Sequence, residues 1–198
     1  MPWFWLSMAL IGGVLTFDTK EEFFELLLFM FAGFISVLVH ELGHALMARH
    51  FGQRVHIVLE AFGGYAAHSG SKLTRFRSFL ITAAGPAIQI LLGLVVLVLL
   101  REVESMSANG KYFFRTLCLI SFFWAFLNLL PVLPMDGGRI METILGPERI
   151  RLTLQISIAV AVVVAALALA FNFGLLLPIF MGIMAYQSYQ SLKSISWR

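Results

Sequence analysis

Six apolar segments divide this chain of 198 residues and decide what it can fold into. A helix needs about 20 apolar residues to cross a bilayer, within a range of about 17–25. Hydrophobic residues make up 60% of the sequence and charged residues 13%, against about 45–50% and about 25% in soluble proteins. A soluble domain of this length has too little interior for that apolar surface, which excludes a soluble enzyme, a disordered regulator and a nucleic-acid-binding module. The segments are residues 2–17, 23–48, 78–100, 112–130, 152–171 and 174–189.

These segments predict an all-α polytopic membrane protein with about six transmembrane helices in one domain, residues 1–198. Residues 2–17 are short for a span, and they lack the basic start and small-residue cleavage site of a signal peptide. We therefore expect a retained helix there. The catalytic core is expected over residues 23–140, and the C-terminal transmembrane helices over residues 152–190.

Basic residues are distributed unevenly between the two sides of these spans. Cytoplasmic loops of membrane proteins are enriched in Lys and Arg. With the N-terminus inside, the outer segments carry Lys20, Arg101, Lys111 and Arg115. The inner segments carry Arg49, Arg54, Lys72, Arg75, Arg77, Arg139, Arg149, Arg151, Lys193 and Arg198. This bias predicts that the second and fourth spans both end at the cytoplasmic side.

The second span ends in the motif His40-Glu41-Leu42-Gly43-His44, which has the pattern H-E-x-x-H. Histidines four residues apart lie on one face of a helix and can both bind one metal ion. Glu41 is placed to take a proton from a water that the metal activates. Ionisable groups in an apolar helix are costly and indicate a functional site. The alternative is a pair of helix-terminal histidines that pack against polar backbone.

A catalytic zinc site usually has three protein ligands, so a third is needed. Asp136 stands out, because it follows two prolines and precedes two glycines at the end of the fourth span. Irregular backbone at membrane depth requires burial in protein or a watery cavity. A hydrolase in a bilayer needs such a cavity. The alternative for Asp136 is a solvated turn residue in an interfacial loop. The other candidates are His50, His56, Glu60, His68 and Glu142.

HELGH on one apolar segment, followed about ninety residues later by N-x-x-P-x-x-P-x-D-G-G on another, resembles the site-2 protease family of intramembrane zinc metalloproteases. The chain looks like a minimal form without a PDZ or CBS domain. The resemblance implies that His40, His44 and Asp136 bind one Zn²⁺ and that Glu41 is the general base. It implies cleavage of a transmembrane protein substrate near the cytoplasmic face, in regulated intramembrane proteolysis. Asn128 matches a family position that helps to hold the site or polarises the substrate carbonyl.

Two further segments are similar to family elements. Residues 55–67 are too short and too rich in glycine for a span, and they resemble the membrane-embedded strand segment of the family. Gly63 and Gly64 are read there as a turn or bulge, and an edge strand could bind an extended substrate. A surface hairpin is the alternative. Gly85-Pro86-Ala87-Ile88-Gln89 resembles the family element G-P-x-x-N, with Gln89 in place of the usual Asn, and Met135 stands where Leu is common.

Two alternatives to intramembrane proteolysis predict different sequence features. A membrane-tethered metalloprotease working in water would have an amphipathic HExxH helix and a sizeable soluble domain, which this sequence does not indicate. A metal transporter or other non-proteolytic metal-binding membrane protein would carry ionisable residues on more than two spans. The fifth and sixth segments have almost none inside.

Overall fold

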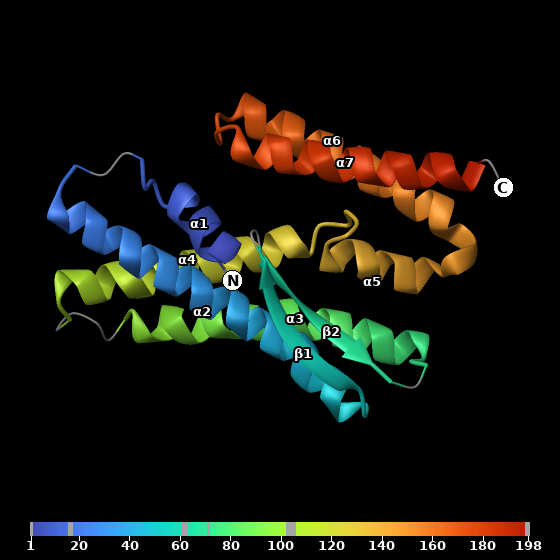
Figure 1. Ribbon diagram of the computed structural model, residues 1–198, viewed down its shortest axis with the longest axis horizontal. Helices are drawn as coiled ribbons and strands as arrows, with labels where there is room; N and C mark the ends of the chain where they lie inside the picture. The colour runs from blue at the N-terminus through green and yellow to red at the C-terminus, as the bar shows by residue number, and fades with distance from the viewer. Residues whose placement is uncertain (1, 16–17, 61–62, 71, 102–105, 197–198) are drawn as a thin grey trace. The chain divides into compact units, whose positions relative to one another are not determined.

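The computed structural model describes residues 2–15, 18–60, 63–70, 72–101 and 106–196 (Figure 1). It contains the helices α1 (Pro2–Ile11), α2 (Lys20–His50), α3 (Arg75–Leu99), α4 (Ala108–Asn128), α5 (Asp136–Leu145), α6 (Ile150–Ala170) and α7 (Leu176–Ser196). A 3₁₀ turn, η2 (Pro147–Arg149), precedes α6, and the strands are β1 (Arg54–Glu60) and β2 (Gly63–Ser69). The chain divides into two compact units, Met1–Lys72 with Ala83–Phe126 and Leu73–Thr82 with Leu127–Arg198.

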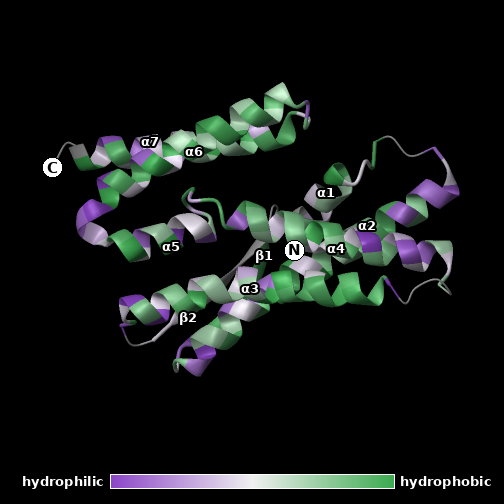
Figure 2. Cartoon of the chain, turned by 180° about the vertical axis from the view of Figure 1, so that it is seen from behind, coloured by the Kyte–Doolittle hydropathy of each residue, from purple (hydrophilic) through white to green (hydrophobic). Residues whose placement is uncertain are grey.

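Four helical segments of the described residues are long and apolar enough to cross a membrane. They are α2, α3, α4 and the run from η2 through α6, and only 28–33% of the residues in their most apolar windows are buried within the protein. Hydrophobic residues, green in Figure 2, predominate along these helices, and many of their large apolar side chains are exposed. Exposed apolar surface of this extent is suited to lipid, which confirms a helical membrane protein.

Six spans remain a prediction. The first segment forms only the 10-residue helix α1, about 15 Å long, and its last residues, 16–17, lie outside the described residues. α7 has 21 residues but is not among the span candidates, and its second half carries Gln187, Gln190 and Lys193.

In the first unit, α2 packs against α3, α4, α1 and the hairpin. A capping box starts α2, because the Thr19 hydroxyl accepts from the Glu22 N–H and the Glu22 carboxylate accepts from the Thr19 N–H. The buried face of α2 repeats every four residues. Its members are Ala32, Ser36, His40, His44 and Ala48, each at most 9% exposed. The two histidines of the motif therefore face the interior of the protein.

The predicted strand segment forms an antiparallel hairpin against α2, visible in Figure 1. Leu59 of β1 is buried with Phe4 and Met8 of α1 and Val37 of α2. Gly63 and Gly64 are not the turn or bulge that the sequence indicated. They are the first two residues of β2 and pair with Glu60 and Leu59.

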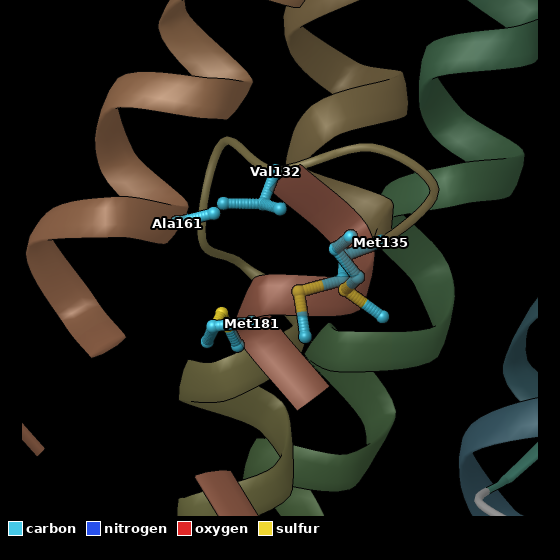
Figure 3. Packing of buried hydrophobic residues seen from close by; sticks show 5 residues of the cluster. Val132, Met135, Ala161 and Met181 are labelled. Atoms are coloured by element: carbon cyan, nitrogen blue, oxygen red, sulfur yellow. The ribbon is translucent and has the colours of Figure 1, made fainter. Parts of the chain in front are cut away.

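In the second unit, α6 and α7 pack over the loop that leads from α4 into α5 (Figure 3). Val132 and Met135 from the loop are buried with Ala161 of α6 and Met181 of α7. Met135, which replaces the Leu common in the family, thus anchors the residue before Asp136 in an apolar core. α5 itself was missed, because its ten residues form no long apolar segment.

The two ends of α5 are held by polar contacts and small residues. A Cβ on Gly137 would collide with the Leu129 and Leu130 carbonyls, and one on Gly138 would lie 2.5 Å from the Leu133 nitrogen. Only glycine allows the loop backbone to approach so closely. At the other end, the Arg75 guanidinium donates to the carbonyls of the last turn of α5, at 2.7–3.0 Å. These contacts fix the helix that begins at Asp136.

Ser157→Ala is expected to destabilise the second unit by about 1–3 kcal/mol, because the Leu133 N–H then loses the acceptor to which it donates at 3.1 Å. Ser157 is 0% exposed, so water cannot replace it. The measurement is the midpoint of denaturation in increasing SDS. Ser191→Ala, at an exposed position on α7, is the control and should move the midpoint little. Equal midpoints for both variants would contradict this role of Ser157.

Candidate metal centre

His40 and His44 lie one turn apart on the buried face of α2. Their exposed fractions are 4% and 9%, and their Nε2 atoms are 3.1 Å apart. Two imidazole ligands of a tetrahedral zinc ion, each about 2.0–2.1 Å from the metal, would be separated by about 3.4 Å. The pair is therefore spaced as two ligands of one ion, as the motif predicted.

Glu41 follows the first histidine and is 4% exposed. Glu41 is one residue after His40 on α2, so it lies on a different side of the helix from the face that the two histidines share. A carboxylate buried at membrane depth is costly, which favours a chemical role over a structural one.

Small residues allow α3 to approach the histidines closely. A Cβ on Gly43 would lie 2.5 Å from the Ala84 carbonyl oxygen of α3. A Cβ on Gly85 would collide with the His44 imidazole ring. The Gly85-Pro86 element that the sequence singled out therefore makes room for a candidate ligand.

Gly85→Ala is expected to weaken zinc binding at least about tenfold, because the added methyl group must displace the His44 ring. Zinc affinity can be measured by competition with a chromophoric chelator in detergent. Gly182→Ala on α7 is the matched control, since its Cβ would meet nothing within 4 Å. If the Gly85 variant kept the affinity of the control, the close contact with His44 would not govern the site.

His40 has a second partner that the motif did not reveal. Its Nδ1 lies 2.9 Å from Oε1 of Gln89, which is 0% exposed on α3. Gln89 Nε2 donates to the Ser36 hydroxyl at 2.8 Å, and the Ser36 and Ser121 hydroxyls are 3.1 Å apart. A signal for this network exists in the sequence, since a polar amide among apolar residues of a span normally faces the protein interior.

Asp136 and Asn128 belong to the second unit. Asp136 is half-buried at the start of α5, and Asn128 is the half-buried last residue of α4. The first turn of a helix favours a carboxylate, because N–H groups without helical partners point toward it. Among the other candidates, His50 and His56 are exposed, Glu142 is half-buried on α5, and the side chains of Glu60 and His68 lie outside the described part.

A buried HExxH pair on a span-like helix is typical of a membrane metallopeptidase. The model of peptidase family M50 matches residues 28–108 and 101–173. The chain belongs to peptidase family M50. The resemblance to site-2 proteases is confirmed, and this membership agrees with zinc as the cofactor.

Individual relatives also support membership of this family. A zinc metalloprotease of Methanocaldococcus jannaschii is 35% identical over 113 residues, which are 57% of this chain and 32% of that protein. Stage IV sporulation protein FB of Bacillus subtilis is 31% identical over 144 residues, 71% of this chain and 44% of that protein. The chain thus spans less than half the length of these relatives. The site-2 protease structure from M. jannaschii matches with a TM-score of 0.70 at 24% identity, covering 95% of this chain and 86% of that one, which shows the shared fold.

Proposed function

We propose that the chain is an intramembrane zinc endopeptidase that hydrolyses a peptide bond in or near the transmembrane segment of a membrane-protein substrate. The observation that carries the proposal is the pair of buried imidazoles with Nε2 atoms 3.1 Å apart, next to the buried Glu41 on a span-like helix. Membership of peptidase family M50 supports it. Regulated intramembrane proteolysis is the process that such a reaction would serve.

One Zn²⁺ per chain would be held by His40, His44 and Asp136. Two imidazole nitrogens and one carboxylate oxygen are a donor set typical of catalytic zinc. When bound, zinc acts as a Lewis acid that activates water and polarises a carbonyl. Asp136 is proposed as the third ligand because α5 presents its carboxylate in a first turn that is fixed by Gly137, Gly138 and the buried Met135.

Glu41 would act as the general base and then as the general acid. Its carboxylate takes a proton from the attacking water and transfers it to the amine that leaves when the peptide bond breaks. Burial at 4% exposure separates this proton transfer from bulk solvent. The Asn128 amide, at the end of α4, would help to hold the site or donate to the substrate carbonyl.

The hairpin would bind the substrate in an extended conformation. A helical peptide bond is inaccessible to a protease, so a transmembrane substrate must first unwind at the cleavage site. The two-stranded sheet of the described residues has an outer edge on each strand, and an edge can accept another strand by hydrogen bonding. Gly63 and Gly64, at the start of β2, are proposed to be part of the edge that binds the substrate.

The whole chain, residues 1–198, is proposed as a single intramembrane protease domain of about six spans, with its active site toward the cytoplasm. The support for this orientation is the excess of Lys and Arg in the segments expected inside. The bilayer itself is the other partner of the protein. The short helix α1 packs on α2 through Met8 and completes the first unit.

A non-proteolytic metal-binding protein or metal transporter is the alternative, and the structure does not favour it. α6 carries an ionisable side chain only at Arg151, in its first turn, whereas a transport path would need polar groups along several spans. The test uses the purified chain in liposomes with a transmembrane peptide. We expect cleavage that a zinc chelator stops and added Zn²⁺ restores. Zinc uptake by the liposomes without cleavage would instead support transport.

A further inference from the structure

We infer that Gln89 is a positioning residue, whose side-chain amide fixes the orientation and tautomer of His40 so that Nε2 is the metal-binding nitrogen. This inference rests on the proposed zinc site. Gln89 is 0% exposed in the apolar helix α3, and its Oε1 lies 2.9 Å from His40 Nδ1. Burying an amide costs free energy unless its polar groups are hydrogen-bonded. The hydrogen bond to His40 is therefore part of what stabilises Gln89 inside the protein.

The orientation of the Gln89 amide follows from its partners. Its Nε2 lies 3.3 Å from the Ser36 backbone oxygen and 2.8 Å from the Ser36 hydroxyl. A backbone carbonyl can only accept a hydrogen bond, so the NH₂ group of the amide must face Ser36. Oε1 therefore faces His40. The Ser121 hydroxyl, 3.1 Å from that of Ser36, links the network to α4.

The tautomer of His40 follows in turn. Oε1 of an amide can only accept, so Nδ1 of His40 must carry the proton and donate it to Gln89. The lone pair of a neutral imidazole is then on Nε2, the atom that lies 3.1 Å from His44 Nε2. Metal-binding histidines are commonly oriented by such a second hydrogen bond, and loss of the partner typically costs about 10–100-fold in metal affinity.

All members of the network are buried. Ser36, Gln89 and Ser121 are each 0% exposed, and they come from α2, α3 and α4. Water cannot replace a lost partner there, and the rotation of the Gln89 amide is fixed by two contacts on Ser36. One polar chain thus links the orientation of a candidate ligand to the packing of three helices.

The first test compares zinc affinity, measured by chelator competition, in three variants. Gln89→Met keeps the length of the side chain but lacks a strong acceptor, and it should bind Zn²⁺ about 10–100-fold more weakly. Gln89→Glu retains an oxygen that accepts from His40 but loses the donation to Ser36, and it should bind Zn²⁺ more tightly than Gln89→Met. Gly182→Ala on α7 lies outside the network, since its Cβ would meet nothing within 4 Å, and it should stay within about threefold of the parent. Equal weakening by Met and Glu, or no weakening by Met, would overturn the inference.

The second test reads the tautomer directly in the parent chain. In the zinc-free parent chain labelled with ¹⁵N-histidine, at pH 8, the resonances of His40 are assigned by their loss in His40→Asn. We expect the Nδ1–H form of His40, and an Nε2–H form would overturn the inference. Neither readout requires cleavage. A parent chain that binds zinc but cuts no substrate would contradict the proposed function and leave this inference standing.

Discussion

Glu41→Gln is expected to lower cleavage of a transmembrane substrate by about 10²–10⁴-fold while the zinc content stays that of the parent. The amide has nearly the size of the carboxylate, so the packing around a residue that is 4% exposed should be kept. It cannot take a proton from water, which is the step assigned to Glu41. The measurements are metal content by mass spectrometry and the initial rate of cleavage in liposomes.

Glu25→Gln is the matched control for this substitution. Glu25 lies on the same helix and is half-buried, but it lies four turns before the motif. It should keep the parental cleavage rate. A Glu41 variant that is as fast as this control, with zinc bound, would contradict the assignment of the general base.

Asp136→Ala should have the second large effect, a loss of zinc affinity of at least about a hundredfold. Removing one of three protein ligands leaves two imidazoles, a set too small for a stable catalytic site. Met135 is buried, and Gly137 and Gly138 pack closely against the preceding loop, so these three residues should keep the start of α5 in place. Zinc titration in detergent measures the affinity, and SDS denaturation checks the fold.

Glu142→Ala separates a specific ligand from a general effect of negative charge. Glu142 is another half-buried carboxylate on α5. Its loss should leave zinc affinity within about threefold of the parent, as expected for a group outside the donor set. If both variants bound zinc equally, Asp136 would not be the third ligand.

The sequence predicted the features that depend on local pattern. Long apolar segments are sufficient to define membrane helices, and α2, α3, α4 and α6 lie within a few residues of the predicted ranges. The i, i+4 spacing placed His40 and His44 on one helix face, as the structure shows. The paired motifs predicted the family, which the match to peptidase family M50 confirms.

Features that depend on tertiary packing could not be predicted from the local sequence pattern. In the sequence, Gln89 is only a mild departure from a family motif. The structure shows that its amide is hydrogen-bonded to His40. Hydropathy placed residues 131–151 in a loop and missed α5, because this short helix is stabilised by contacts of Arg75, Gly137 and Met135 rather than by an apolar run. The pair Gly63 and Gly64 indicates a turn or bulge, whereas the structure places both at the start of β2, since glycine alone does not distinguish these positions.

Water is proposed to attack a peptide bond within a membrane, and isotope labelling tests this reaction most directly. The zinc-loaded chain is incubated in H₂¹⁸O with liposomes that contain a transmembrane peptide, and the products are analysed by mass spectrometry. We predict one new carboxyl terminus, in or near the apolar segment of the peptide, that carries ¹⁸O. An intact peptide, or cleavage confined to residues far outside the apolar segment, would contradict the proposed reaction.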